Sequence, residues 1–309
     1  MRSRALLFIL SITLLYSGCK NRPAPGGLNN ELFPGALVKF VPYNNNPVFE
    51  ATGADTWDRL IRERGFILFE DGKYKLWYTG YSGKDSDTKY LGYATSDDGI
   101  NWKRYPENPI FSEKWTEDMF VFKNDGKYYM YAEGKDDVAH LLISDDGILW
   151  QEQGDLVIMK VNGDTIPGPY GTPNVFIENG RWYLFYERND EGIWVAESVD
   201  LKTWKNIQDN PVLNPGPEKY DARMIASNQV IKYNGRYYIY YHGVGNSTED
   251  PSTSVWTSNL AMSTDLLHWV KYPGNPFVEG DHSSPVMVAT GSKYRLYTMH
   301  PSVCLYFQE

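Results

Sequence analysis

Two carboxylic side chains, Glu63 and Asp118, have sequence neighbours that would give them opposite acid–base properties. Asp118 precedes Met119 and Phe120, an apolar flank that favours the protonated form, whereas Glu63 lies between two arginines that favour the ionised form. Cleavage of a glycosidic bond needs two such carboxyl groups, one to protonate the leaving oxygen and one to activate water or attack carbon. Glu63 and Asp118 are therefore candidates for catalysis. Their charged neighbours are candidates for substrate binding: Arg62, Arg64 and Glu117.

Two further aspartates, Asp58 and Asp221, occupy equivalent places in the chain. Asp58 lies seven residues before Gly65 in WDRLIRERGF, and Asp221 lies seven residues before Asn228 in YDARMIASNQ. Arginine follows each closely, so each could be a cap at a strand entry with a local ion pair. In the functional alternative, Asp58 is a second candidate for the catalytic base. Asp221, beside Arg223, would then hold a substrate hydroxyl or modulate a pKa.

The elements that must position these residues are five copies of one repeat. Each copy has Gly or Ser, then Lys or Arg, then an aromatic residue and an apolar strand, and successive copies are 54, 54, 55 and 57 residues apart. They are GKYKLWY, GKYYMYA, GRWYLFY, GRYYIYY and SKYRLYT, beginning at Gly72, Gly126, Gly180, Gly235 and Ser292. Four copies are followed by an Asp-containing turn that ends in tryptophan, at Trp102, Trp150, Trp204 and Trp269. This period predicts an all-β fold, a five-bladed β-propeller of four-stranded antiparallel blades.

A short Asn-Pro pattern predicts how the ring closes. It introduces blades at Asn108, Asn210 and Asn275, and it also occurs at Asn46, ahead of the first repeat. The fifth repeat reaches Glu309 without a turn that ends in tryptophan. We therefore expect residues 37–49 to supply the outer strand of the last blade, which would remove an exposed sheet edge.

The starts of the innermost strands of a propeller converge on the channel mouth, where binding residues gather. Eight places before the opening residue of each repeat stand Arg64, Asp118, Thr172, Ser227 and Ser284. Blades 1 and 2 carry the charge at this position. In blade 3, Thr172 and Asn174 are candidates for substrate binding.

Composition restricts the function further. The chain of 309 residues has a formal net charge of −9, which argues against nucleic acid as a partner because that binding depends on Lys and Arg. Aromatic residues make up 15%, with 24 tyrosines, and we expect about two thirds of them to interlock blades while others line a sugar site. Neither cysteine nor histidine spacing predicts a metal site, and we expect no cofactor.

The first residues resemble a targeting segment. Arg2 and Arg4 precede an apolar run and the sequence YSGC, which is similar to a bacterial lipoprotein cleavage box with Cys19 as the lipidated residue. We therefore expect a signal peptide at residues 1–19, a flexible linker at 20–31 and the propeller at 32–309. The protein would be an exported lipoprotein of the periplasm or outer-membrane surface, in contact with the membrane only through its lipid anchor. The alternative is an ordinary secretory leader.

The repeats and the candidate site residues of the propeller resemble the five-bladed glycosidase superfamily that includes glycoside hydrolase families 43, 32, 117 and 130. TEDMFVF around Asp118 is similar to the Glu-Asp-Pro-Arg stretch of family 130, whose Asp is the proton donor, and YYHGV is similar to that family's Tyr-His-Gly-Val. The resemblance implies that Asp118 is the acid and His242 a site residue. It allows a structural cation on the propeller axis, and the use of histidine in family 117 adds His282 to the candidates.

Departures from the pattern matter equally. Met119 and Phe120 replace the Pro and Arg of family 130, and loss of that arginine weakens phosphate binding. Families 43 and 32 have Asp before Pro in blade 1, where this chain has Arg64 and Gly65. In blade 3, Glu187 closes YLFYE and could reach the channel mouth or form a surface ion pair.

We therefore expect a glycosidase that acts on the end of an oligosaccharide or polysaccharide, with water favoured over phosphate as the attacking group. Two alternatives remain. One is a surface lipoprotein that binds glycans without cleaving them, and the other is a glycoside phosphorylase.

Overall fold

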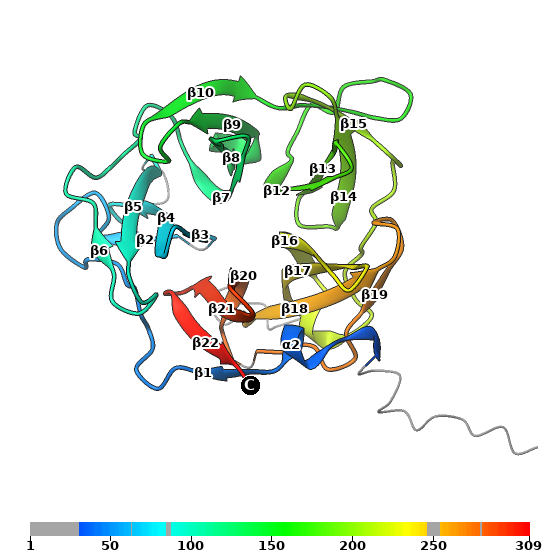
Figure 1. Ribbon diagram of the computed structural model, residues 1–309. Coiled ribbons are helices and arrows are strands. Elements are labelled where there is room, and N and C mark those ends of the chain that lie inside the picture. The colour runs from blue at the N-terminus through cyan, green and yellow to red at the C-terminus, as the bar shows by residue number, and fades with distance from the viewer. Residues whose placement is uncertain (1–30, 63, 85–87, 246–253, 279) are drawn as a thin grey trace, which may run out of the picture.

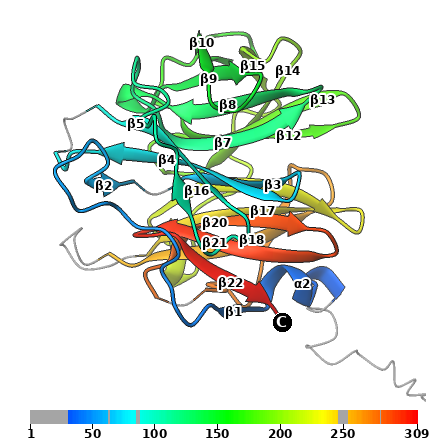
Figure 2. The ribbon, with the colours of Figure 1, turned by 60° about the vertical axis from the view of Figure 1, so that its left-hand side comes forward.

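The computed structural model describes residues 31–62, 64–84, 88–245, 254–278 and 280–309. Five small sheets stand around a central axis like the blades of a propeller (Figure 1). In the view turned by 60°, the first strand of the described chain (blue) lies beside the last strand (red) (Figure 2). The predicted five-bladed, almost entirely antiparallel fold is confirmed.

Each blade runs from an inner strand at the axis to an outer strand at the rim. Blade 1 contains β2 (Leu60–Ile61), β3 (Phe66–Glu70), β4 (Lys73–Tyr81), β5 (Tyr90–Ser96) and β6 (Lys103–Arg104). Blade 2 contains β7 (Glu117–Asn124), β8 (Lys127–Glu133), β9 (Ala139–Ser144) and β10 (Trp150–Asp155). Blade 3 contains β12 (Gly171–Glu178), β13 (Arg181–Glu187), β14 (Ile193–Ser198) and β15 (Thr203–Asn206), with β11 (Val157–Met159) added in parallel to β15.

The last two blades complete the ring. Blade 4 contains β16 (Met224–Tyr233), β17 (Arg236–Val244), β18 (Trp256–Ser263) and β19 (Trp269–Lys271). Blade 5 contains β20 (Ser283–Thr290), β21 (Lys293–His300), β22 (Cys304–Gln308) and β1 (Phe40–Pro42). The short elements outside the blades are α2 (Gly35–Val38), η1 (Lys135–Asp137) and η2 (Lys219–Asp221).

The recurring Asp turns work as side-chain caps. In blade 1, the Oδ1 atom of Asp98 accepts hydrogen bonds from the backbone N–H groups of Ile100 and Asn101, and Ser96 Oγ accepts one from Gly99. Blades 2, 3 and 4 repeat this arrangement with Asp146, Asp200 and Asp265. The local Asp and Ser side chains therefore fix the turn that leads each third strand into the outer strand.

The Asn-Pro pattern closes the ring as predicted. Asn108 pairs through its side-chain amide with both backbone groups of Tyr93, and Asn275 does the same with Leu260. Asn46 makes the equivalent pair with Leu305 of blade 5. Next to it, β1 pairs antiparallel with β22, so the N-terminal segment supplies the outer strand of the last blade. The expected closure by residues 37–49 is confirmed.

Aromatic side chains lock neighbouring blades together. Trp77 of blade 1 donates through Nε1 to the carbonyl of Gly147 in blade 2, and Tyr131 of blade 2 donates to the carbonyl of Leu201 in blade 3. Tyr297 of blade 5 donates to Gly99 in blade 1. These side chains are fully buried, so each combines apolar contact with one satisfied polar atom.

Several N-terminal predictions lie outside the described residues. These are the signal peptide at 1–19, Cys19 and all but the last residue of the linker at 20–31. Within the described part of the chain, no helix is long and apolar enough to cross a membrane.

Candidate active site

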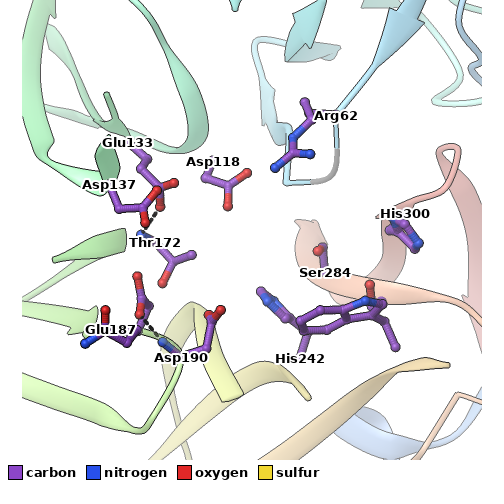
Figure 3. Close-up of a pocket in the computed structure, with 13 residues that line it drawn as sticks. Arg62, Asp118, Glu133, Asp137, Thr172, Glu187, Asp190, His242, Ser284 and His300 are labelled. Atoms are coloured by element: carbon purple, nitrogen blue, oxygen red, sulfur yellow. Dashed lines mark hydrogen bonds between the residues drawn. The ribbon is translucent and has the colours of Figure 1, made fainter. Parts of the chain in front are cut away.

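A pocket of about 250 Å³ opens at one mouth of the central channel (Figure 3). Its walls come from the starts of inner strands and the ends of second strands, so all five blades contribute. The lining residues are Arg62, Asp118, Glu133, Asp137, Thr172, Glu187, Asn189, Asp190, His242, Trp256, Ser283, Ser284 and His300.

The inner-strand position chosen from the repeat is a backbone irregularity in the structure. Its φ angle is positive in Arg64 (60°), Asp118 (51°), Thr172 (42°) and Ser284 (58°), and the register of β7, β12 and β16 shifts at the same place. Residues with a Cβ, above all β-branched ones, adopt this conformation only where the surroundings impose it. Such a bulge re-aims a side chain. Three of these four residues line the pocket.

A second set of lining residues comes from the ends of the second strands. Seven places after the opening residue of each repeat stand Thr79, Glu133, Glu187, His242 and Met299. Glu133, Glu187 and His242 line the pocket, and in blade 5 the next residue, His300, takes that role. The bulge position and the strand-end position of adjacent strands thus meet at the channel mouth.

Charge is distributed unevenly around the pocket (Figure 3). We call the carboxylates of blades 2 and 3 the acidic wall: Asp118, Glu133, Asp137, Glu187 and Asp190. We call the lining residues from blades 1, 4 and 5 the mixed wall: Arg62, His242, Trp256, Ser283, Ser284 and His300. A neutral polyol would find hydrogen-bond acceptors on one side and mostly donors on the other.

Glu187 is held rigidly at the end of β13. Its Oε1 atom accepts a hydrogen bond from the N–H of Gly171 at 3.0 Å, and its Oε2 atom accepts one from the N–H of Asp190 at 2.6 Å. The side chain is 4% exposed. Burial, with the charge of Asp190 next, raises the pKa of Glu187 to about 7.

Glu133, the equivalent residue of blade 2, reaches across to blade 3. Its Oε2 atom accepts a hydrogen bond from the N–H of Thr172 at 2.8 Å. Burial, and then the charges of neighbouring carboxylates, raise the pKa of Glu133 well above its ordinary value. A Cβ at Gly171 would overlap both Glu133 Oε2 and Glu187 Oε1, so glycine is required between the two carboxyl groups.

Two arginines of blade 1 form ion pairs with blade 2. The Nε atom of Arg62 lies 3.0 Å from Glu117 Oε2, and Nη1 of Arg64 lies 3.5 Å from Asp118 Oδ2. Trp115 also donates to Glu117. The charged neighbour of Asp118 therefore comes from the next blade, in addition to the buried apolar flank expected from its own segment.

The mixed wall contains aromatic and hydroxyl groups. The ring of His242 packs edge-on against Trp256 at 5.3 Å between centroids, and His242 Nδ1 lies 3.2 Å from Asn228 Oδ1. The hydroxyls of Thr172 and Ser284 are buried and have no hydrogen-bond partner among the residues that the structure describes. They are placed to bind hydroxyl groups of a ligand.

Asp58 and Asp221 do not line the pocket. Asp58 Oδ2 accepts from Arg104 at 3.0 Å and from Tyr78 at 3.1 Å. Asp221 Oδ2 accepts from Lys271 at 2.6 Å and from Tyr241 at 2.8 Å. Both aspartates are buried and tie the entry of a blade to its second and outer strands. This geometry favours the structural alternative, although the cations come from distant strands and not from the neighbouring arginines.

Five other candidates, including Arg64 at the bulge position of blade 1, also lie outside the pocket lining. Glu117 binds Arg62 and Trp115, while Asn174 is buried and donates to Ser227. Arg223 is exposed, and the backbone carbonyl of His282 accepts from Ser258. Glu63 lies outside the described residues.

Sequence reasoning missed several lining residues. The lining residues that are not among the candidates are Glu133, Asp137, Asn189, Asp190, Trp256, Ser283, Ser284 and His300. Ser284 does stand at the inner-strand position of blade 5, but the sequence did not single it out as a binding residue. Counting seven places after each repeat opening, as well as eight before, would have found Glu133. No such signal exists for Asp137 and Asp190, which follow the second strands in turns of unequal structure. Across the described ranges, no group of three or more His, Cys, Asp or Glu is arranged to hold a metal ion.

The sequence and the fold of this chain are similar to those of proteins that act on glycosidic bonds. The N-terminal domain of glycosyl hydrolases family 32 matches residues 64–166. A curated relative, the 1,2-β-oligomannan phosphorylase of Thermoanaerobacter sp. (strain X514), is 26% identical over 76% of this chain and 86% of its own length.

Solved structures with the same fold include both hydrolases and phosphorylases. A glycosyl hydrolase from Bacteroides ovatus superimposes with a TM-score of 0.67 at 17% identity, over 87% of this chain and 92% of the other. The β-1,2-mannobiose phosphorylase of Listeria innocua, in complex with β-1,2-mannobiose, gives 0.66 at 16% identity, over 87% and 96%. The chain therefore has the five-bladed β-propeller fold of these structures, and its sequence is similar to that of enzymes that process glycosidic bonds.

Proposed function

We propose that this protein is a glycoside hydrolase that cleaves the end of an oligosaccharide or polysaccharide, with Asp118 as general acid and Glu187 as general base. One observation carries the proposal. A single pocket brings together two carboxyl groups from different blades whose environments differ, one beside a guanidinium and one buried among backbone N–H groups. Separate acid and base roles require such a difference. The guanidinium of Arg64 by itself favours the ionised form of Asp118, so the acid role of Asp118 rests on its place in the pocket and on the resemblance of its sequence segment to family 130.

The role of Glu187 follows from its hydrogen bonds. Both of its oxygens accept N–H groups, an arrangement that suits the ionised carboxylate. A pKa of about 7 makes that carboxylate a better base than an ordinary glutamate. Glu187 replaces Glu63 and Asp58 as our candidate for the base.

The role of Asp118 rests on its placement and on the resemblance of TEDMFVF to the proton-donor stretch of family 130. The positive φ of Asp118 places the side chain in the pocket. In the reaction, Asp118 gives its proton to the leaving oxygen as the glycosidic C–O bond breaks. Glu187 takes a proton from water as the water oxygen bonds to the anomeric carbon. This single displacement inverts the configuration at that carbon.

The acidic wall favours water over phosphate as the attacking group. It places five carboxylates in the pocket, whereas the arginine of the lining, Arg62, already forms an ion pair with Glu117. Phosphate binding depends on cationic donors that are available to the anion. A phosphate dianion would be repelled by those carboxyl groups of the acidic wall that are ionised, and water would not.

Phosphorolysis is the second candidate, because the curated relative from Thermoanaerobacter is a phosphorylase. The names of that relative and of the Listeria structure also indicate which glycan to test first. We propose β-1,2-linked mannooligosaccharides as the first substrate class.

The experiment that tests the proposal is incubation of the purified protein with β-1,2-mannobiose and longer oligomers, with and without inorganic phosphate. We expect mannose as the product at equal rates in both conditions, and no product from Asp118→Asn. Mannose 1-phosphate formed only with phosphate would show a phosphorylase. Binding of a broad glycan panel without any cleavage would show a glycan-binding propeller. Proton NMR of the first product tests the predicted inversion.

We also propose that the enzyme is exported and anchored through Cys19. The Arg-rich start, the apolar run and the YSGC sequence support this proposal. Incorporation of labelled fatty acid into the wild type, but not into Cys19→Ala, is the expected result in a bacterial host.

A further inference from the structure

Glu133 lines the pocket, and only one of its two carboxyl oxygens accepts a hydrogen bond within the described ranges. It ends β8, opposite Glu117 in the register of β7. Its Oε2 atom accepts the N–H of Thr172, whereas Oε1 makes no hydrogen bond to any residue described by the structure. The residue is 8% exposed and lines the pocket. A carboxyl group in this position can offer its second oxygen to a bound ligand.

The neighbours of Glu133 are predominantly acidic. The charges of four carboxylates act on it: Glu117 and Asp118 on β7, Asp137 on η1 and Glu187 on β13. The two nearby guanidinium groups, of Arg62 and Arg64, form ion pairs with Glu117 and Asp118. Buried carboxyl groups that share a site in this way cannot all be ionised. Burial and these charges together raise the pKa of Glu133 well above its usual range.

The equivalent residue in blade 3 gives a contrast within the same pocket. Glu187 accepts an N–H group on each oxygen, so both oxygens are acceptors and neither is left to bear a proton. Glu133 accepts on one oxygen only, which leaves Oε1 as the atom that can carry an O–H group. The hydrogen-bond geometry therefore favours the ionised form in Glu187 more than in Glu133, where Oε1 remains available to carry a proton.

We propose that Glu133 acts as a neutral carboxylic acid that donates a hydrogen bond from Oε1 to an oxygen of the bound sugar. The inference rests on the proposed function, because it assigns a specificity residue within the same site. Apart from the proton that Asp118 transfers in the reaction, the acidic wall would otherwise offer acceptors alone. A neutral Glu133 adds a donor there, which suits a sugar oxygen that accepts, such as a ring or hydroxyl oxygen. Glutamine has a similar shape and, like protonated glutamate, can donate from one end of the group and accept at the other.

The first test compares activities of isosteric variants. We expect Glu133→Gln to retain kcat/KM within about fivefold of wild type, because the amide donates where the acid did and still accepts from Thr172. Glu133→Met should raise KM at least tenfold with a smaller change in kcat, since it removes the donor. The matched control is Glu187→Gln at the equivalent position, which should lose kcat. A folded Glu133→Gln that loses kcat by 100-fold or more would overturn the inference.

The second test does not depend on turnover. Infrared difference spectra at pH 8.5 should contain a neutral carboxylic acid band that is lost in Glu133→Gln and kept in Glu187→Gln. Adding β-1,2-mannobiose to the Asp118→Asn variant should shift this band, because a new hydrogen bond forms to the acid. A band that is absent, or that mannobiose binding leaves unmoved, would contradict the inference. If the wild type cleaves no glycan but the band shifts with the sugar, the proposed hydrolysis fails and this inference stands.

Discussion

Buried carboxylates serve two different purposes in two regions of this propeller. At the blade entries, Asp58 and Asp221 each accept from a tyrosine and a cation of the same blade. In the pocket, Glu133 and Glu187 accept backbone N–H groups and form no ion pair with any residue in the described ranges.

The difference separates stability from chemistry. A buried carboxylate that is paired with a cation is costly to disturb, because its partner would be left uncompensated. A buried carboxylate without such a partner has a raised pKa and carries a cost in stability at neutral pH. The second arrangement is expected where protons are transferred. Substitution by an isosteric amide should therefore mainly lower stability at the blade entries and mainly lower catalytic activity in the pocket.

The largest effect is expected at Asp118. Asp118→Asn removes the proposed proton donor while the bulge and the packing of its neighbours remain. We expect kcat to fall by about 10³-fold or more, and the melting temperature to fall as well, because the amide leaves the buried Arg64 without its anionic partner. Steady-state kinetics on β-1,2-mannobiose and a thermal melt measure both. Turnover close to wild type would remove Asp118 from the acid role.

The next effect is expected at Glu187. Glu187→Gln should lower kcat by about 10²-fold, and it should abolish the fall in kcat/KM that we expect in the wild type below about pH 7. Asn189→Ala, at a neighbouring lining residue without a titratable group, is the control and should keep that pH dependence. An unchanged acidic limb in Glu187→Gln would assign the limb to another group.

The same variant has a stability signature with a definite sign. The pKa of Glu187 is raised from its model-peptide value near 4.5 to about 7, so its folded-state advantage is present below pH 4.5 and is lost as pH rises through 7. The stability of Glu187→Gln relative to wild type should therefore rise by about 1–3 kcal/mol from pH 5 to pH 8. A cost that does not depend on pH is added, because the amide nitrogen cannot accept one of the two backbone N–H groups. Urea unfolding at the two pH values measures the rise.

At the blade entries, the comparison predicts loss of stability without loss of chemistry. Asp221→Asn would leave Lys271, whose side chain is 16% exposed, without its anionic partner, at a cost of about 3–5 kcal/mol. Asp58→Asn should cost less, because the side chain of Arg104 is 34% exposed. We expect kcat to stay near wild type in both variants at 25 °C. A selective loss of kcat in a fully folded Asp58→Asn would return Asp58 to the list of catalytic candidates.

The smallest effect concerns a clamp between blades 1 and 2. Glu70 accepts from Lys75 at 2.6 Å, and it also binds Lys123 and Tyr128. Burial alone would raise the pKa of Glu70, but the hydrogen bonds from these three donors lower it to about 2. The clamp therefore stabilises the fold above pH 4.5 and loses its effect as pH falls towards 2. Glu70→Gln should cost about 1 kcal/mol at pH 7 and nothing near pH 2, as measured by unfolding at each pH.

Most of the fold could be predicted from the sequence because local chemistry repeats. The Ser and Asp turn caps, the Asn-Pro pairs and the repeat opening each act within a few residues or on an adjacent strand. Counting within the repeat also identified Asp118 and Thr172 as equivalent positions, although it did not predict their positive φ angles. The repeat also predicted that β1 completes blade 5.

The site was harder to predict because its partners are distant in sequence. Arg104 is 46 residues from Asp58, and Lys271 is 50 residues from Asp221. The sequence around each aspartate points to the nearby arginines, so it predicts the wrong cation as the partner. Glu133 meets Thr172 across a blade boundary, 39 residues away. Sequence neighbours therefore could not indicate which carboxylates are paired with cations and which are not.

The pairing of β1 with β22 has a consequence for biosynthesis. β1 is the first strand of the five blades to be synthesised, but its hydrogen-bonding partner β22 is the last. During translation the growing arc of blades therefore has open edges at both ends, and these edges attract other strands. The ring can close only after β22 has been made, so we expect chaperone contacts during synthesis to concentrate on the first and last blades.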